Sequence, residues 1–117
     1  MTRSNLATTT VALCLIAGST ASASQNVDGA LVGLHELRRE GRLICMVAHW
    51  HTGSGSGPTQ KSALTAAVRD WSGFTAWEYG NHWGLWRNAR SKTERCTRRD
   101  SGGFECVVDG RPCKPMR

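Results

Sequence analysis

Two histidines, His49 and His51, lie two residues apart in the stretch His-Trp-His, a spacing that can bring both imidazoles to one metal ion. Residues i and i+2 of a β-strand project from the same face. Neutral imidazoles are good ligands for zinc and copper, and His35, His82 or Glu78 would have to supply a third donor. The sequence contains no H-E-x-x-H motif and no acidic pair beside the histidines. It therefore favours two histidines at a strand end near solvent, with a metal-dependent activity centred on His49 and His51 as the alternative.

The next stretch, Gly53-Ser-Gly-Ser-Gly57, is rich enough in glycine to raise the question of phosphate binding. From Gly55 onward the chain matches the P-loop pattern G-x-x-x-x-G-K-[ST], except that Gln60 replaces the second glycine. Pro58 also removes one backbone N–H donor, and the dinucleotide pattern G-x-G-x-x-G fails at the same two residues. What remains is a helix N-terminus with Lys61 beside it, which can attract an anion. We expect a flexible strand-to-helix connection here, with Lys61 as a candidate anion contact.

The other chemistry-bearing residues argue against an enzyme. No G-x-S-x-G motif surrounds any serine, and the cysteines of an exported chain are expected to be oxidised, which removes the common nucleophiles. Glycoside hydrolysis needs two carboxylates across a cleft, and Asp70 and Glu78 are available. A chain this short has little room for such a cleft. We expect a non-catalytic protein that requires no cofactor.

Basic residues concentrate in one part of the chain. The formal net charge is +6, or +5 when the first 23 residues, which carry one arginine and no acidic residue, are left out. Between residues 87 and 99 only Glu94 opposes six basic residues, which we call the basic strip: Arg87, Arg90, Lys92, Arg95, Arg98 and Arg99. This strip favours an anionic envelope polymer or an acidic protein as partner, and no nucleic-acid motif is present. The alternative interpretation is that arginine fills exposed strand and turn positions.

The beginning of the chain predicts export. Arg3 precedes an apolar stretch at residues 11–17, and Ala21-Ser-Ala23 forms an A-x-A cleavage site, so residues 1–23 are predicted to be a secretory signal peptide. Lipid attachment at Cys14 is disfavoured because Leu13 stands where a small residue is expected. The apolar stretch is far shorter than the roughly 18 residues that a membrane span needs. We expect a periplasmic or extracellular protein without stable membrane insertion after cleavage.

Four cysteines remain after the signal peptide, and an even number in an oxidising compartment favours two disulfides. Cys96 and Cys106 flank the predicted turn Asp100-Ser-Gly-Gly103, and they lie directly opposite each other if this hairpin has a three- or five-residue loop. Cys45 and Cys113 would then form the second pair. A zinc site built from the four thiols is the alternative, but the sequence has no C-x-x-C pair.

The elements that must position the histidines begin upstream of them. Leu31, Leu34 and Leu37 are spaced three apart, which predicts a short amphipathic helix within residues 30–40. Residues 43–51 are bulky and apolar without a breaker, which predicts a continuous strand that carries both histidines on one face.

A long helix is predicted to follow the glycine-rich stretch, which itself is expected to be a loop over residues 53–57. Thr59 is a suitable entry residue, apolar positions repeat with helical spacing up to Tyr79, and Gly80 is the expected C-terminal stop. Gly73 lies inside this helix, where a kink or a close contact would explain it.

Together these elements predict an α+β fold, with one main helix packed on a small, mostly antiparallel sheet and stapled by disulfides. Most of the five tryptophans are expected in the core, with Trp83 and Trp86 the most exposed. We divide the chain into the signal peptide, 1–23, an N-terminal segment with the short helix, 24–41, and a small α+β domain, 42–117.

Aromatic, glycine and cysteine residues are spaced along the chain in a recognisable order: Lys61-x-x-x-x-Ala66, Trp71, Glu78-Tyr-Gly80, Trp86-x-x-Ala89, Lys92-x-x-x-Cys96, Phe104-x-Cys106 and Arg111-Pro-Cys113. This pattern resembles a group of small exported bacterial proteins of unknown function, over roughly residues 49–113. The resemblance implies a shared fold and offers no catalytic residues. We therefore expect a binding or structural protein that contacts an anionic envelope component or a protein partner through Lys61 and the basic strip.

Overall fold

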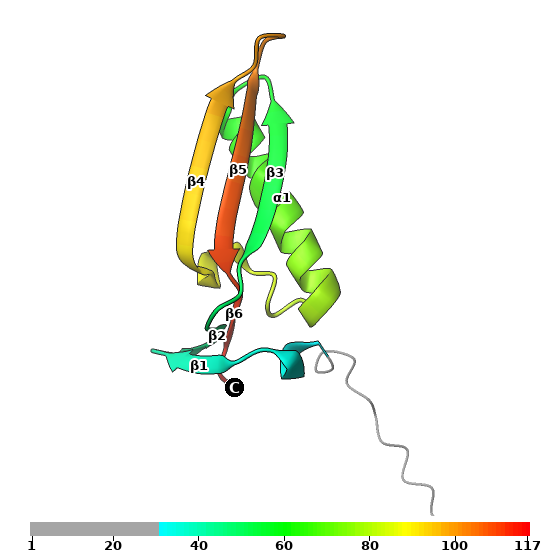
Figure 1. Ribbon diagram of the computed structural model, residues 1–117. Helices are drawn as coiled ribbons and strands as arrows, with labels where there is room; N and C mark the ends of the chain where they lie inside the picture. Colours follow the sequence, from blue (N-terminus) through cyan, green and yellow to red (C-terminus); the bar gives the residue numbers. More distant parts are fainter. Residues whose placement is uncertain (1–30) are drawn as a thin grey trace, which may run out of the picture.

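The structure, a computed structural model, describes residues 31–117 (Figure 1). The predicted signal peptide and the following residues up to 30 lie outside the described part of the chain. Within that part, no helix is long and apolar enough to cross a membrane. The elements in chain order are η2 (Val32–Leu34), β1 (Leu37–Glu40), β2 (Leu43–Met46), β3 (His51–Gly57), α1 (Gln60–Tyr79), η3 (Trp86–Asn88), β4 (Arg90–Arg98), β5 (Phe104–Arg111) and β6 (Cys113–Pro115).

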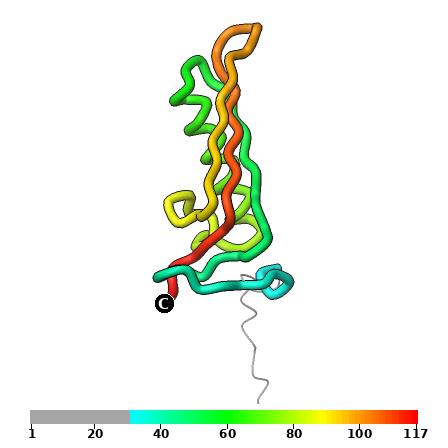
Figure 2. Tube along the Cα trace, turned by 60° about the vertical axis from the view of Figure 1, so that its left-hand side comes forward, coloured from blue at the N-terminus to red at the C-terminus, as the bar shows by residue number. Residues whose placement is uncertain are grey.

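The strands form two antiparallel three-stranded sheets, one in the order β1-β2-β6 and the other in the order β3-β5-β4. Helix α1 lies along one face of the second sheet, mainly against β3 and β5, and the smaller sheet lies at one end of the larger one (Figures 1 and 2). The predicted α+β fold is confirmed, with the difference that its strands divide between two sheets.

Helix α1 begins and ends where its boundary residues predict. The Thr59 hydroxyl accepts a hydrogen bond from the Ser62 N–H at 3.1 Å, and the Ser62 hydroxyl accepts one from the Thr59 N–H at 3.1 Å, which forms a capping box. Gly80, with φ 96°, ends the helix. Gly73 weakens the helix interior by about 1 kcal/mol relative to alanine. An added Cβ at Gly73 meets nothing within 4 Å, so close packing does not explain this glycine.

The glycine-rich stretch is a strand, and its prediction as a loop was wrong. β3 pairs with β5 from His51 to Gly57. A Cβ added at Gly53 would lie 2.4 Å from the Ala67 carbonyl oxygen, and one at Gly55 would lie 2.3 Å from the Ala67 nitrogen. The glycines therefore let the helix backbone approach the strand more closely than any side chain would allow. Because this need arises only when the helix is in place, local sequence reasoning could not detect it.

The N-terminal predictions were also wrong in part. Over the described residues 31–40 the predicted helix does not form, because after the short η2 the strand β1 pairs with β2, and Leu34 remains 77% exposed. The predicted strand over 43–51 is interrupted. β2 ends at Met46 and pairs within the small sheet, whereas β3 begins at His51 and pairs within the large one. The chain changes sheets between these two strands, so a continuous ladder cannot form.

The C-terminal hairpin and both disulfides are confirmed. Cys96 lies opposite Cys106 in the β4–β5 ladder, the five residues 99–103 connect the two strands, and the two cysteines are bonded. Cys45 is bonded to Cys113 across β2 and β6. The four thiols are consequently not available for the alternative zinc site.

Apolar side chains bury the interface between α1 and the large sheet. Trp71 is fully buried there, and Val108 lies beneath it on β5. The prediction for the tryptophans was wrong in detail, since Trp83 is 2% exposed and the exposed indoles are Trp50 and Trp77, at 50% and 79%. Trp83 is covered because it packs with residues of η2, β2 and the end of α1 in a second cluster.

Arg111 joins the two sheets. This side chain is 6% exposed, and its guanidinium donates to the Met46 carbonyl oxygen at 2.6 Å and to both Glu40 carboxylate oxygens at 2.8 and 3.1 Å. The hydrogen bonds from Arg111 and its positive charge lower the pKa of Glu40. The last residue of β5, the central strand of the large sheet, thus fixes the position of β1 and β2.

Candidate functional site

Three histidines gather beside the C-terminal end of α1. They and two helix residues form what we call the histidine cluster: His35, His49, His51, Glu78 and Tyr79. His35 follows η2, His49 lies between β2 and β3, and His51 opens β3. The ring centroids of His35 and His49 are 4.2 Å apart, and those of His49 and His51 are 4.8 Å apart. The convergence therefore depends on the contact between the two sheets and the helix.

Hydrogen bonds fix the orientation of His51. The Thr75 hydroxyl donates its single proton to the Trp71 carbonyl oxygen at 2.7 Å, so it can only accept from the Nδ1–H of His51 at 2.9 Å. The Nε2 atom of His51 then faces Oε2 of Glu78 at 3.0 Å. A neutral His51 ring in this tautomer presents a lone pair to the carboxylate, so either a proton on Nε2 or a bound metal ion would bridge the two atoms.

Tyr79 connects the other two histidines. Its hydroxyl lies 3.0 Å from Nε2 of His35 and 3.0 Å from Nε2 of His49. One hydroxyl has one proton, so Tyr79 donates to one imidazole and accepts from the other. The shared hydroxyl places His35 beside His49. His35 is nevertheless not among the three residues whose ligand atoms converge, which are His49, His51 and Glu78.

Burial governs the charges in the cluster. It lowers the pKa of His51, and the nearby His49 lowers it further, while Glu78 raises it. Burial likewise lowers the pKa of His49, with His35 acting in the same direction and Glu78 against it. Burial and the Glu78 carboxylate raise the pKa of Tyr79 to about 12. Burial therefore favours neutral rings at His49 and His51 and a protonated Tyr79 hydroxyl beside Glu78.

The closest donors form a set that can hold a metal ion. One ligand atom each from His49, His51 and Glu78 lie within 4.8 Å of one another. Two imidazole nitrogens and a carboxylate oxygen suit zinc, copper or iron and leave at least one coordination position open. The Thr75 hydroxyl on Nδ1 of His51 is the kind of outer partner that orients metal-binding histidines.

Sequence reasoning named part of this set. It proposed His49 and His51, with Glu78 and His35 among the candidates for a third donor, and these four residues lie together. His82 does not join them, since it is exposed in the turn after α1. The roles of Thr75 and Tyr79 were missed. Helical spacing could have identified both residues. Residues i, i+3 and i+4 of one helix share a face, and Glu78 and Tyr79 lie three and four residues after Thr75.

A family model described as a protein of unknown function, DUF995, matches residues 16–99. The chain belongs to the DUF995 family. No curated protein and no solved structure matches it. The matched range of DUF995 includes the whole histidine cluster and α1, whereas β5, β6 and two of the four disulfide cysteines lie beyond it.

The basic strip of this DUF995 chain does not form one surface. Arg95 lies 4.0 Å from Asp109, whereas the guanidinium of Arg98 lies over the Phe104 ring, and residues three apart on a strand point to opposite faces. Lys92 packs over Trp86. Lys61 is exposed in the first turn of α1, on a different element. The strip and Lys61 therefore remain separate candidate contacts.

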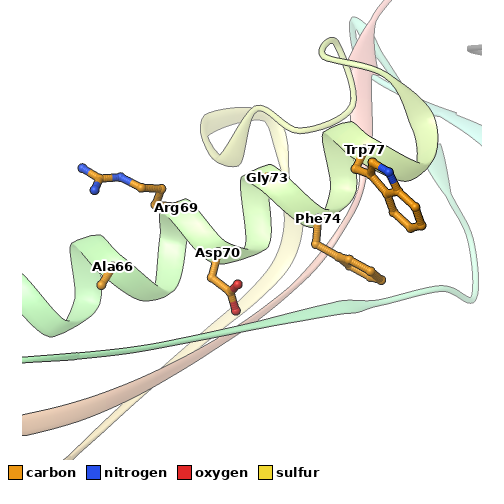
Figure 3. Close-up of a pocket in the computed structure, with 6 residues that line it drawn as sticks. All are labelled: Ala66, Arg69, Asp70, Gly73, Phe74 and Trp77. Carbon is orange, nitrogen blue, oxygen red and sulfur yellow. The ribbon is translucent and has the colours of Figure 1, made fainter.

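An open groove lies along the exposed side of α1 (Figure 3). Six residues of the helix line it: Ala66, Arg69, Asp70, Gly73, Phe74 and Trp77. Phe74 links this groove to the histidine cluster, since the centroid of its ring is 5.0 Å from that of His51.

Proposed function

We propose that this protein is an exported domain that binds a divalent transition-metal ion through His49, His51 and Glu78. The observation that carries the proposal is the convergence of one ligand atom each from His49, His51 and Glu78 within 4.8 Å of one another, with the Thr75 hydroxyl orienting the His51 ring. The earlier expectation had placed binding to an anionic partner first and metal at the histidines second, and the side-chain geometry favours the reverse order.

The burial of His51 supports a metal ion over a second proton on the ring. An imidazolium would satisfy the same geometry, but burial of the ring opposes its positive charge. A metal ion accepts the lone pairs of both imidazoles and the carboxylate at once, and it leaves the rings neutral. Zinc binds histidine nitrogen at about 2.0–2.1 Å, so small rotations of His49 and Glu78 would bring all three donors onto one ion.

The donor types narrow the choice of metal. Imidazole with carboxylate is suited to zinc, copper(II) and other first-row ions, whereas calcium and magnesium prefer oxygen ligands throughout. The three protein donors leave a position that water or an oxygen of a further ligand would fill. The proposed function is therefore the capture of such an ion, with a site open to exchange.

Native mass spectrometry of the protein purified without chelator or affinity tag tests this proposal. We expect the mass of one bound metal ion together with two disulfides. Glu78→Gln keeps the shape of the side chain and removes the charge, and it should weaken zinc or copper affinity by more than about 10-fold. Glu105→Gln, at an exposed position on β5, is the matched control and should bind as tightly as the unchanged protein. Equal affinities for both variants, or no metal binding by the unchanged protein, would contradict the proposal.

A second candidate function is contact with an anionic partner through the arginines of the basic strip that lie near the β4–β5 connection. Arg98 ends β4 and Arg99 begins the connection to β5, and this hairpin projects beyond α1 (Figure 1). Replacement of Arg95, Arg98 and Arg99 by glutamate should abolish binding to lipopolysaccharide or to an immobilised polyanion. The same replacements should leave metal affinity unchanged, which separates the two functions.

A further inference from the structure

The groove on α1 exposes the most solvent-accessible aromatic residues of the described helix. Trp77 is 79% exposed and Phe74 is 46% exposed, and their rings stack with centroids 6.1 Å apart and an interplanar angle of 27°. Figure 3 shows both side chains leaving the helix next to the bare position at Gly73. Two adjacent exposed aromatic rings form the kind of apolar surface through which proteins contact partners.

The spacing along this side of α1 is that of a helix-packing seam. Ala66, Asp70, Gly73 and Trp77 follow one another at intervals of four, three and four residues, the spacing by which helices pack side by side, and we call them the helix stripe. Gly73 has no local reason to lack a side chain, since a Cβ there would meet nothing within 4 Å. A neighbouring helix that needs room at this position would supply that reason.

The order of sizes along the stripe makes it complementary to itself. The small residue Ala66 lies at one end, the large residue Trp77 lies at the other, and Asp70 and Gly73 lie between them. A two-fold axis between Asp70 and Gly73 would set each Trp77 on Ala66 of the second copy. The same axis would place each Asp70 opposite Gly73 of the second copy, with Arg69 beside it as a cationic neighbour. We propose that α1 pairs antiparallel with α1 of a second copy through the helix stripe.

Addition of an extended peptide to the neighbouring strand is the main competing arrangement, and Asp70 opposes it. β3 is an edge strand of its sheet, so one side of its backbone is not paired with another strand. The Asp70 carboxylate accepts a hydrogen bond from the Ser54 N–H at 2.9 Å and thereby occupies a backbone donor that an added strand would need. One backbone donor of this edge is therefore already occupied, which favours packing on the helix surface over strand addition.

The proposal is independent of metal binding, and its test is the state of association of the full oxidised chain. One helix stripe buries less than the roughly 800 Å² per partner of standard interfaces, so we expect a reversible dimer with a dissociation constant in the micromolar range. Sedimentation equilibrium should show a concentration-dependent rise from the monomer mass toward twice that mass. A protein that stays monomeric up to about 1 mM would overturn the proposal.

Two matched pairs of variants locate the contact. Trp77→Ala should weaken dimerisation by at least about 10-fold, whereas Trp50→Ala removes an exposed indole outside the stripe and should have no effect. Gly73→Glu should abolish the dimer, and Gly33→Glu, at another glycine with free space, should leave it intact. Each variant is checked for the near-ultraviolet circular dichroism of the unchanged protein. A dimer that responds equally to both members of a pair, or a monomer that uses Trp77 to bind a peptide or a lipid vesicle, would overturn the proposal.

Discussion

Replacement of Gly53 by alanine tests the close contact between β3 and α1 on which the fold depends. The substitution adds one methyl group at a strand position that any residue can adopt, since Gly53 does not have a positive φ. Its effect therefore reports mainly packing, because the opposing gain from a less flexible unfolded chain is only about 0.4–1 kcal/mol. The added Cβ would lie 2.4 Å from the carbonyl oxygen of Ala67 and 2.6 Å from Cβ of Trp71.

The size of the effect follows from these distances. Carbon atoms in contact lie about 3.5–4.0 Å apart, so strand and helix would have to separate by about 1 Å. Overpacking of a core costs about 1–3 kcal/mol, and the atoms met at Gly53 are backbone and Cβ atoms that cannot rotate away. We therefore expect a loss of about 3 kcal/mol in the free energy of unfolding. At about 4–8 °C per kcal/mol for a domain of this size, the Tm falls by about 12–24 °C.

Thermal unfolding followed by circular dichroism, at a concentration where the chain is monomeric, measures this loss. Gly73→Ala is the control, because it adds the same methyl group to a glycine with free space. Alanine is the better helix former by about 1 kcal/mol, so this variant should unfold about 4–8 °C above the unchanged protein. A Gly53→Ala variant that melts within 2 °C of the unchanged protein, on the order of the error of such a scan, would refute the close-contact account of β3.

Three further predictions concern the site, the junction of the sheets and the disulfides. Thr75→Val removes the acceptor that orients His51, and should weaken metal affinity by about 10–100-fold while Thr65→Val, exposed on the same helix, leaves it unchanged. Because Arg111 lowers the pKa of Glu40 from its ordinary value near 4.5, the stabilising contribution is present above that value and is lost as the pH falls through the lower folded pKa. Glu40→Gln should therefore show a smaller loss of unfolding free energy between pH 5 and 3, over roughly the range where such a carboxylate titrates. Removal of the disulfide that spans 68 residues should cost about 4 kcal/mol, against about 3 kcal/mol for the one that spans 10, as measured by urea unfolding of the paired Cys→Ala variants.

The parts of the fold that sequence predicted correctly are those set by local signals. Thr59 and Gly80 mark the ends of α1 because capping and helix termination depend on a few neighbouring residues. The β4–β5 hairpin and its disulfide follow from the turn residues between Cys96 and Cys106. The helix predicted within residues 30–40 was wrong. The spacing of three leucines suggests a helix, but pairing of β1 with β2 overrides that preference.

The candidate site was only partly predictable for a similar reason. The spacing of His49 and His51 suggested a metal site only as the alternative interpretation, and the carboxylate that would complete the donor set comes from a helix 27 residues further along the chain. Helical periodicity places Thr75 and Glu78 on one face of α1, yet it does not show which strand residue that face will meet. The exposed positions of Trp50 and Trp77 depend in the same way on packing that the sequence does not specify locally.

The glycines of β3 and the histidine cluster belong to one structural argument. β3 begins at His51 and runs away from the cluster, while α1 returns beside it and ends at Tyr79, so the end of the helix lies next to the start of the strand (Figure 1). Gly53 is two residues beyond His51 and lies under Trp71, one helical turn before Thr75. The distance between strand and helix at this glycine therefore sets whether Thr75 and Glu78 reach the two nitrogens of His51. A side chain at Gly53 would move the helix by more than a hydrogen bond tolerates, so the stretch that was expected to be a flexible loop instead holds Thr75 and Glu78 beside His51.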